Sequence, residues 1–211
     1  AVNPNRETID GIPAYPNLDS LPKVPELAII ATPPASVPEL IAELGKRGTK
    51  AAVVITSGFA SGGDLGGEGG YDPILEAAKP YLLRVLGPNC MGVTVPRHGL
   101  HVNFSRVRAL PGNIAFVAQS GAVQTVVLDW AAERHIGFSH FVALGDMADV
   151  DFGDMLDYLA NDPSARAILL YMESAVHSRK FMSAARAAAR MKPVIVLKTG
   201  RHEEGARAAA S

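Results

Sequence analysis

Residues 111–123, PGNIAFVAQSGAV, join an apolar run to the start of an amphipathic segment. The apolar run covers 114–118 and passes directly into Gln119-Ser120-Gly121. Beyond it, apolar residues at 123, 126, 127 and 130 recur at the spacing of one helix face. A nearly continuous apolar run is typical of a strand that is buried on both faces of a parallel sheet. The stretch therefore predicts a buried strand, a tight turn and a helix.

The same pattern recurs along the chain. Further apolar runs are separated by segments with helical periodicity, and this alternation is typical of βαβ units. The runs cover 27–31, 52–56, 82–86, 141–144, 167–171 and 194–197, and the helical segments include 37–44, 155–159 and 181–185. The predicted fold class is α/β, with two Rossmann-like or flavodoxin-like parallel-sheet units.

An irregular stretch divides these two units. Residues 96–110 contain prolines and glycines, scattered charge and no sustained period, so we predict a connector there. The predicted units are residues 1–95 and residues 111–211. The abrupt opening, with Ala1 rather than Met, leads us to expect a chain cut from a longer protein, with its first unit truncated at the N-terminus.

Composition restricts the possible partners. The chain is 48% hydrophobic and its formal net charge is −1, so no broad basic field is available to attract nucleic acid or an anionic membrane. Cys90 is the only cysteine, which excludes an internal disulfide and favours a cytoplasmic protein. No apolar stretch approaches the roughly 20 residues that a membrane span needs.

Ligands of open α/β sheets bind beyond the carboxyl ends of the strands, so the residues after each apolar run are the candidates. The step through Ser120 and Gly121 is the best candidate for phosphate, because free amides and the helix dipole meet at a helix start. An equally weighted alternative is that Ser120 only caps the helix. Glu173 follows the apolar run 167–171 and is either a functional carboxylate or a surface residue at a loop start.

The turn at 87–92, GPNCMG, is rigid at its proline and permissive at both glycines. Asn89 can donate and accept hydrogen bonds there. A nucleophilic Cys90 would need a base or a helix start to lower its pKa, and the sequence shows neither. We therefore expect Cys90 to form part of a wall around a ligand.

Three other features have simpler interpretations. The glycine-rich segment 57–71 is interpreted as a surface loop, with the alternative that Ser57-Gly58-Phe59 lies beside a ligand. The acidic residues between 146 and 157 are interpreted as helix-start acids rather than metal ligands, and the histidines, including His202, lack the spacing of a zinc site. Four basic residues are expected on a solvated helix face: Arg179, Lys180, Arg186 and Arg190.

Nearly the whole chain resembles the α side of the acyl-CoA synthetases that form a nucleoside diphosphate. The resemblance extends to the ADP-forming acetyl-CoA synthetases and, more distantly, to the α subunit of succinyl-CoA synthetase. It rests on VNP (2–4), IATPPASVP (30–38), VVITSGF (53–59), GPNCMGV (87–93), PGNIAFVAQSGAV (111–123), the segment 136–163, AILLYMES (167–174) and KPVIVLKTGR (192–201). FMSAARAAARMKPVIVLK (181–198) is most similar to bacterial fusion proteins that also carry a nucleotide-grasp domain and a GNAT acetyltransferase domain.

The resemblance implies a CoA-binding domain over 1–95, without its first glycine-rich phosphate turn, and a ligase domain over 111–211. Four loops match family segments that surround CoA: Asn3-Pro4, Pro33-Pro34, Ser57-Gly58-Phe59 and Asn89-Cys90. Ser120-Gly121 matches the helix start that receives the phosphate of a phosphohistidine, and Glu173 matches the glutamate that orients that histidine. The histidine itself is expected after Ser211.

The implied activity of the parent protein is an acid–thiol ligase reaction that converts acid, CoA and ATP to acyl-CoA, ADP and phosphate. The implied ligands are CoA, ATP or ADP with Mg²⁺, and a small carboxylic acid or acyl-CoA. The implied protein partners are a nucleotide-grasp domain or β-type subunit and an acetyltransferase domain, and the protein is expected to be a homo-oligomer. The alternative is a region that senses CoA or acyl-CoA and controls an acetyltransferase without ligase chemistry. A dehydrogenase piece is disfavoured because no GxGxxG motif follows the first strand.

Overall fold

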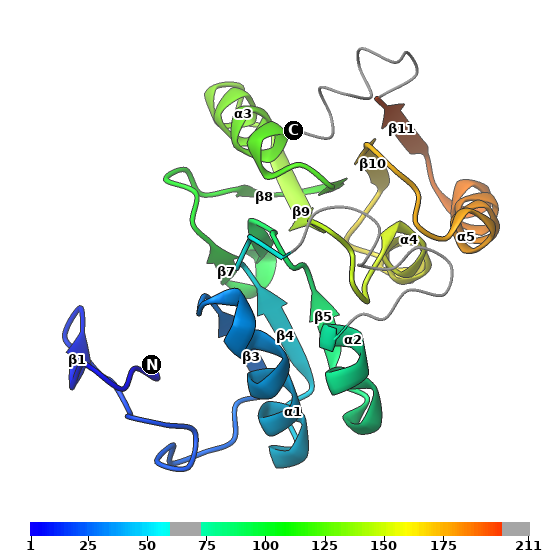
Figure 1. Ribbon diagram of the computed structural model, residues 1–211. Coiled ribbons are helices and arrows are strands. Elements are labelled where there is room, and N and C mark those ends of the chain that lie inside the picture. Colours follow the sequence, from blue (N-terminus) through cyan, green and yellow to red (C-terminus); the bar gives the residue numbers. More distant parts are fainter. Residues whose placement is uncertain (60–72, 200–211) are drawn as a thin grey trace.

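The computed structural model describes residues 1–59 and 73–199. Its first sheet is parallel, with β3 (Leu27–Ile30), β4 (Ala51–Val54) and β5 (Arg84–Leu86) in that order. The helices α1 (Val37–Arg47) and α2 (Pro73–Ala78) pack beside each other against it (Figure 1). Apolar side chains at the α1 spacing, including Ile41 and Leu44, are buried against the strands, as the periodicity predicts.

The second sheet has six strands in the order β11-β10-β8-β9-β6-β7. Its parallel part contains β8 (Leu110–Ala118), β9 (Gly137–Ala143), β10 (Ala167–Met172) and β11 (Val194–Lys198). The strand predicted from the apolar run at 141–144 thus begins at Gly137. The α/β class with parallel sheets is confirmed.

Helices cover both faces of the second sheet (Figure 1). Helix α3 (Gly121–Glu133) packs over Phe116 and Ala118, whereas α4 (Phe152–Asn161) and α5 (Ser178–Met191) pack over Ala115 and Val117. Alternate residues of one strand thus enter two separate cores. This double burial explains why the β8 sequence is continuously apolar.

The predicted connector contains regular structure. A hairpin of β6 (Gly92–Val95) and β7 (Leu100–Asn103), joined by the short helix η3 (Pro96–His98), pairs antiparallel with β9 at the edge of the second sheet. The prediction of an irregular connector over 96–110 was wrong in this respect. Each strand has four residues, which places only two side chains on each face and leaves no period to detect.

A segment of the second unit completes the first sheet. Residues 146–150 run along the free edge of β5, where Val150 N–H donates to Val85 C=O (3.1 Å) and Ala148 N–H to Gly87 C=O (3.0 Å). The Asp149 carboxylate accepts from Val85 N–H and from Arg84 Nε, both at 2.8 Å. The two sheets are therefore joined by main-chain hydrogen bonds as well as by a shared apolar cluster that includes Val53, Met91 and Ala143.

The N-terminal segment forms a small antiparallel pair, β1 (Thr8–Ile9) with β2 (Ile12–Pro13), that is set apart from the first sheet (Figure 1). It is followed by Leu18, which enters the first core, and Asp19, which pairs with Arg47 of α1. The remaining short helices of the first unit are η1 (Pro34–Ser36) and η2 (Lys79–Tyr81). Within 1–59 and 73–199, no helix has the length and apolar character that crossing a bilayer requires.

Candidate functional site

The loops beyond β3, β4 and β5 are held side by side by hydrogen bonds. Thr56 Oγ1 donates to Thr32 C=O (2.7 Å), and Asn89 N–H donates to Thr56 C=O (2.9 Å). A Cβ built on Gly58 would lie 3.6 Å from Pro34 Cγ, so these two loops are in contact. The structure thus brings together Pro33-Pro34, Ser57-Gly58 and Asn89-Cys90, as expected from their positions at neighbouring strand ends.

Asn89 is exposed and has a positive φ of 55°. Its Nδ2 donates to Asp146 Oδ1 (3.2 Å), while its Oδ1 has no partner within the described parts of the chain. Burial raises the pKa of the Asp146 carboxyl, and the hydrogen bond from Asn89 opposes that shift. The Asn89 amide is therefore anchored at its nitrogen and free to accept at its oxygen.

Cys90 lies beneath these loops and does not form a reactive centre. Its side chain is buried, and Sγ lies 3.3 Å from Val54 C=O. Burial raises the pKa of the thiol to about 12, despite hydrogen bonds from the backbone that lower it. A neutral, enclosed thiol is a poor nucleophile, which agrees with the expectation that Cys90 is not a catalytic thiol.

The start of α3 lies next to this turn. A Cβ on Gly121 would be 3.6 Å from Met91 Cβ, and Thr125 Oγ1 lies 3.7 Å from Met91 Sδ. Ser120 Oγ accepts from Val123 N–H (3.4 Å), so Ser120 is the N-cap. No acceptor among the described residues is recorded for the amides of Gly121 and Ala122, which leaves two donors and the positive helix end for an anion. Capping and anion binding are thus compatible here.

Glu173 lies at the end of β10, beside the end of β8. Its backbone N–H donates to Gln119 Oε1 (3.1 Å), which sets it next to Ser120. The residue is half-buried, and burial raises the pKa of its carboxyl while Lys198 opposes the shift. A half-buried carboxylate with a raised pKa at a strand end is typical of functional positions.

Other predicted residues lie elsewhere. Asn3 and Pro4 belong to the N-terminal segment, where Asn3 N–H donates to Tyr15 C=O (2.8 Å), and among the described residues no hydrogen bond joins them to the loops of the first sheet. Phe59 packs against the core of the first unit. The rest of the glycine-rich segment, residues 60–71, and His202 lie outside the described residues.

The acidic stretch has structural partners. Asp151 caps α4 and forms a capping box with Asp154, as the helix-start interpretation predicts. Lys180 Nζ pairs with Asp151 (3.0 Å) and Asp154 (2.5 Å), so the prediction that Lys180 faces solvent was wrong: α5 packs across α4 and brings the lysine to the cap. In the described ranges, no three His, Cys, Asp or Glu side chains are grouped to hold a metal ion.

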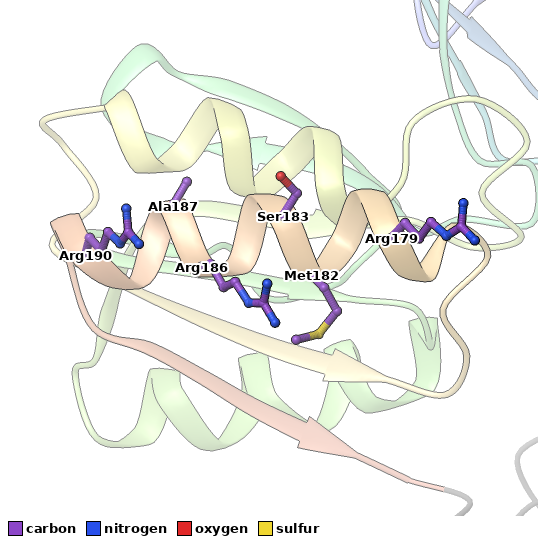
Figure 2. A pocket seen from close by; sticks show the side chains of 6 residues that line it. All are labelled: Arg179, Met182, Ser183, Arg186, Ala187 and Arg190. Carbon is purple, nitrogen blue, oxygen red and sulfur yellow. The ribbon is translucent and has the colours of Figure 1, made fainter.

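The three arginines of α5 line a shallow pocket on its outer side with Met182, Ser183 and Ala187 (Figure 2). Arg179 and Arg190 lie at opposite ends of the helix, with Arg186 between them (Figure 2). None of the three has an ion-pair partner within the described chain, which agrees with the predicted solvated face. The pocket contains none of the residues predicted for the CoA and phosphate loops.

Three residues make contacts at the site that were not predicted, and one of them, Asp146, was interpreted as a helix-start acid but lies outside the capped first turn of α4. Gln119 and Lys198 both touch the backbone of Glu173, and Asp146 holds Asn89. Gln119 was part of the strand–turn–helix motif, but its partner is 54 residues away. Only the pairing of β8 with β10 reveals that contact, so no local pattern could have identified it.

Comparison with known proteins agrees with this geometry. Residues 1–96 match the family model described as a CoA binding domain, and residues 111–211 match the succinyl-CoA ligase like flavodoxin domain. The chain is a CoA-binding domain followed by a succinyl-CoA ligase-like domain. Several of its relatives are ADP-forming acetate–CoA ligases. It is 42% identical over 211 residues to acetate–CoA ligase [ADP-forming] I of Archaeoglobus fulgidus. It is 40% identical over 212 residues to the α subunit of acetate–CoA ligase [ADP-forming] II of Pyrococcus furiosus.

Both alignments cover 100% of this chain but only 31% and 46% of the two relatives, so this ligase-like chain spans less than half of either. Among solved structures, the apo form of the dinucleotide forming acetyl-coenzyme A synthetase 1 of Ca. Korarchaeum cryptofilum superposes with a TM-score of 0.88 at 37% identity. That match covers 100% of this chain and 46% of the other. The ligase-like architecture is therefore shared over the whole described chain.

Proposed function

We propose that the protein containing this chain is an ADP-forming acid–thiol ligase, which joins a small carboxylic acid to CoA through an acyl phosphate and a phosphohistidine. The observation that carries the proposal is the contact between the GPNC turn and the start of α3. Met91, which follows this turn, packs on Gly121 and Thr125, so a loop of the first unit and the start of α3 in the second lie together. A reaction that moves a phosphoryl group and forms a thioester needs both sites within reach of one substrate.

The first unit's loops fit the thiol end of CoA. Ser57, Gly58 and Asn89 are exposed at neighbouring strand ends, and the free Oδ1 of Asn89 can accept from an amide N–H. The small and proline-containing loops allow close approach of a ligand to the backbone. In this proposal they hold the pantetheine arm, which supplies the thiol, while the buried Cys90 only supports them.

The second unit's residues suit a phosphoryl group. The amides of Gly121 and Ala122 lie at the α3 start and have no acceptor among the described residues, so they suit negative charge on phosphoryl oxygens. Glu173 is placed to accept a hydrogen bond from an imidazole N–H and so to hold a histidine that faces the helix end. Nucleotide and Mg²⁺ would be bound by a nucleotide-grasp domain or partner subunit.

The test uses the full-length protein and γ-labelled ATP. Replacing Glu173 by Gln should lower the rate of phosphoenzyme formation by at least about tenfold, because the amide loses the negative charge that favours the imidazole orientation. Glu39→Gln, an exposed change on α1, is the matched control and should label at the wild-type rate. Undiminished labelling of the Glu173 variant would remove its role.

The same experiment separates the ligase from a regulatory region. A protein that only senses CoA or acyl-CoA for an attached acetyltransferase would bind CoA but form no phosphoenzyme from ATP. Absence of label in the wild-type protein, with CoA binding intact, would therefore favour the sensing function.

A further inference from the structure

Both backbone groups of Glu173 are held by side chains from neighbouring strands. Gln119, directly after β8, accepts the Glu173 N–H at Oε1 (3.1 Å). Lys198, the last residue of β11, donates from Nζ to the Glu173 C=O (2.8 Å) and also to Thr199 C=O. The residue is therefore fixed from both sides of β10.

Gln119 makes further bonds to the same loop. Its Oε1 also accepts from Ser174 N–H (3.0 Å), and its Nε2 donates to Ser174 Oγ (3.0 Å). Its own N–H donates to Tyr171 C=O (3.1 Å) in continuation of the strand pairing. The side-chain amide thus occupies the place where a longer β8 would have paired with residues 173 and 174.

This arrangement ties the direction of the Glu173 side chain to the start of α3. Gln119 immediately precedes the N-cap Ser120, so the residue that holds Glu173 is covalently joined to the helix end that offers free amides. Because both backbone groups of Glu173 are held, the direction of its Cα–Cβ bond is fixed, and the carboxylate can reach only the few positions that its staggered rotamers allow. Errors of about 1 Å in such a constellation can cost on the order of 10²-fold in rate.

We propose that Gln119 and Lys198 are positioning residues, which clamp the Glu173 backbone so that its carboxylate faces the phosphoryl site at the α3 start. This inference rests on the role proposed for Glu173. The two members of the clamp differ in one respect. Gln119 is neutral and acts by geometry, whereas Lys198 also carries a positive charge.

That difference gives the clamp a measurable effect on pH dependence. Burial raises the pKa of the Glu173 carboxyl, and Lys198 is the one charged side chain of the described residues that opposes it. The residue next to β8 that contacts Glu173, Gln119, is neutral. If phosphoenzyme formation needs the ionised carboxylate, its rate falls on the acidic side as Glu173 is protonated.

The experiment measures phosphoenzyme formation from labelled ATP against pH in the full-length protein. Gln119→Leu should lower the maximal rate of phosphoenzyme formation about tenfold or more. It should not change the pH at which the rate falls on the acidic side (the acidic limb of the pH–rate profile), because no charge is changed. Lys198→Met should lower the plateau and also move the acidic limb to higher pH, since the carboxyl loses its cation. Lys198→Arg keeps the charge and should leave the limb in place.

If the Gln119→Leu variant fails to fold, Gln119→Glu provides the test instead. Its carboxylate still accepts from both N–H groups, so the plateau should stay within about threefold of wild type. Its added negative charge should move the acidic limb to higher pH. A residue that served folding alone would lower the amount of folded protein without moving the limb.

Two results would overturn the inference, and they are distinguishable. If Glu173→Gln abolishes labelling while the Gln119 and Lys198 variants retain wild-type plateaus and limbs, the clamp is wrong and the proposed function stands. If Glu173→Gln labels normally, the role of Glu173 fails and the clamp has nothing to position.

Discussion

Replacing Asp149 by Ala tests whether segment 146–150 is an integral part of the first sheet. The Asp149 carboxylate holds the edge of β5 in two ways, through Val85 N–H and through Arg84 Nε. Val85 is fully buried, so its N–H would have no solvent to replace the lost acceptor. Arg84 is 52% exposed and keeps Asp154 as a second partner at 3.4 Å.

The expected loss in the free energy of unfolding follows from these two contacts. A buried backbone donor left without a partner costs about 1–3 kcal/mol. A half-exposed ion pair contributes only about 0.2–1 kcal/mol. Asp149→Ala should therefore cost about 2–3 kcal/mol. Asp149→Asn, whose amide oxygen still accepts from Val85, and Arg84→Met should each cost about 1 kcal/mol or less.

The assay is urea unfolding followed by far-UV circular dichroism at constant pH and salt. Because both sheets share the segment, the loss should appear as a lower midpoint with little change in slope. The reasoning is refuted if Asp149→Ala stays within about 0.5 kcal/mol of wild type. It is also refuted if Arg84→Met costs as much as Asp149→Ala, since the ion pair rather than the backbone donor would then dominate.

Three further predictions concern the same junction and the two cores. Gly145 has a φ of 60° and its added Cβ would lie 2.1 Å from Pro88 C=O, so Gly145→Ala should destabilise the chain by about 2 kcal/mol or more. Gly48→Ala is the control, since Gly48 has a φ of 100° but open space around an added Cβ, and it should cost only about 1 kcal/mol. Thermal unfolding of both variants measures the difference. Cys90 should resist Ellman's reagent at neutral pH until the chain unfolds, and rapid labelling of native protein would contradict its burial. Burial also lowers the pKa of His140, so the unfolded chain binds the proton more readily and stability falls as pH drops below about 6.5. His140→Gln should flatten that loss between about pH 7 and 5, and an unchanged slope would exclude His140 as its source.

The parallel strands could be predicted because their sequences are apolar runs, and the central strand β8 is buried on both faces. Ile114 to Ala118 is apolar throughout, since alternate residues enter the α3 core and the α4–α5 core. The hairpin at 92–103 escaped prediction, because its strands are short and lie at the edge of the sheet, where pairing is decided by β9. Local patterns therefore identify strands made of apolar runs, including the edge strands β3 and β11, better than the short strands of the hairpin.

In the candidate site, too, local patterns identify some residues and miss others. Asn89, Ser120 and Glu173 could be named because they follow apolar runs, and strand ends are where ligands bind. The residues that hold two of them in place, Asp146 and Gln119, act over 57 and 54 residues of sequence. Lys180 was misjudged for a related reason, since its carboxylate partners belong to another helix. Such contacts depend on how elements pack, which a single sequence does not contain.

The pairing of 146–150 with β5 has a consequence for swapping parts between related enzymes. A CoA-binding half transplanted onto a foreign partner would arrive with the main-chain groups of Val85 and Gly87 bare. Those groups would be open to pairing with any exposed strand, including one from another molecule. A working chimaera would have to import the loop that follows β9 along with the first sheet, although the two are separated by more than fifty residues of other structure.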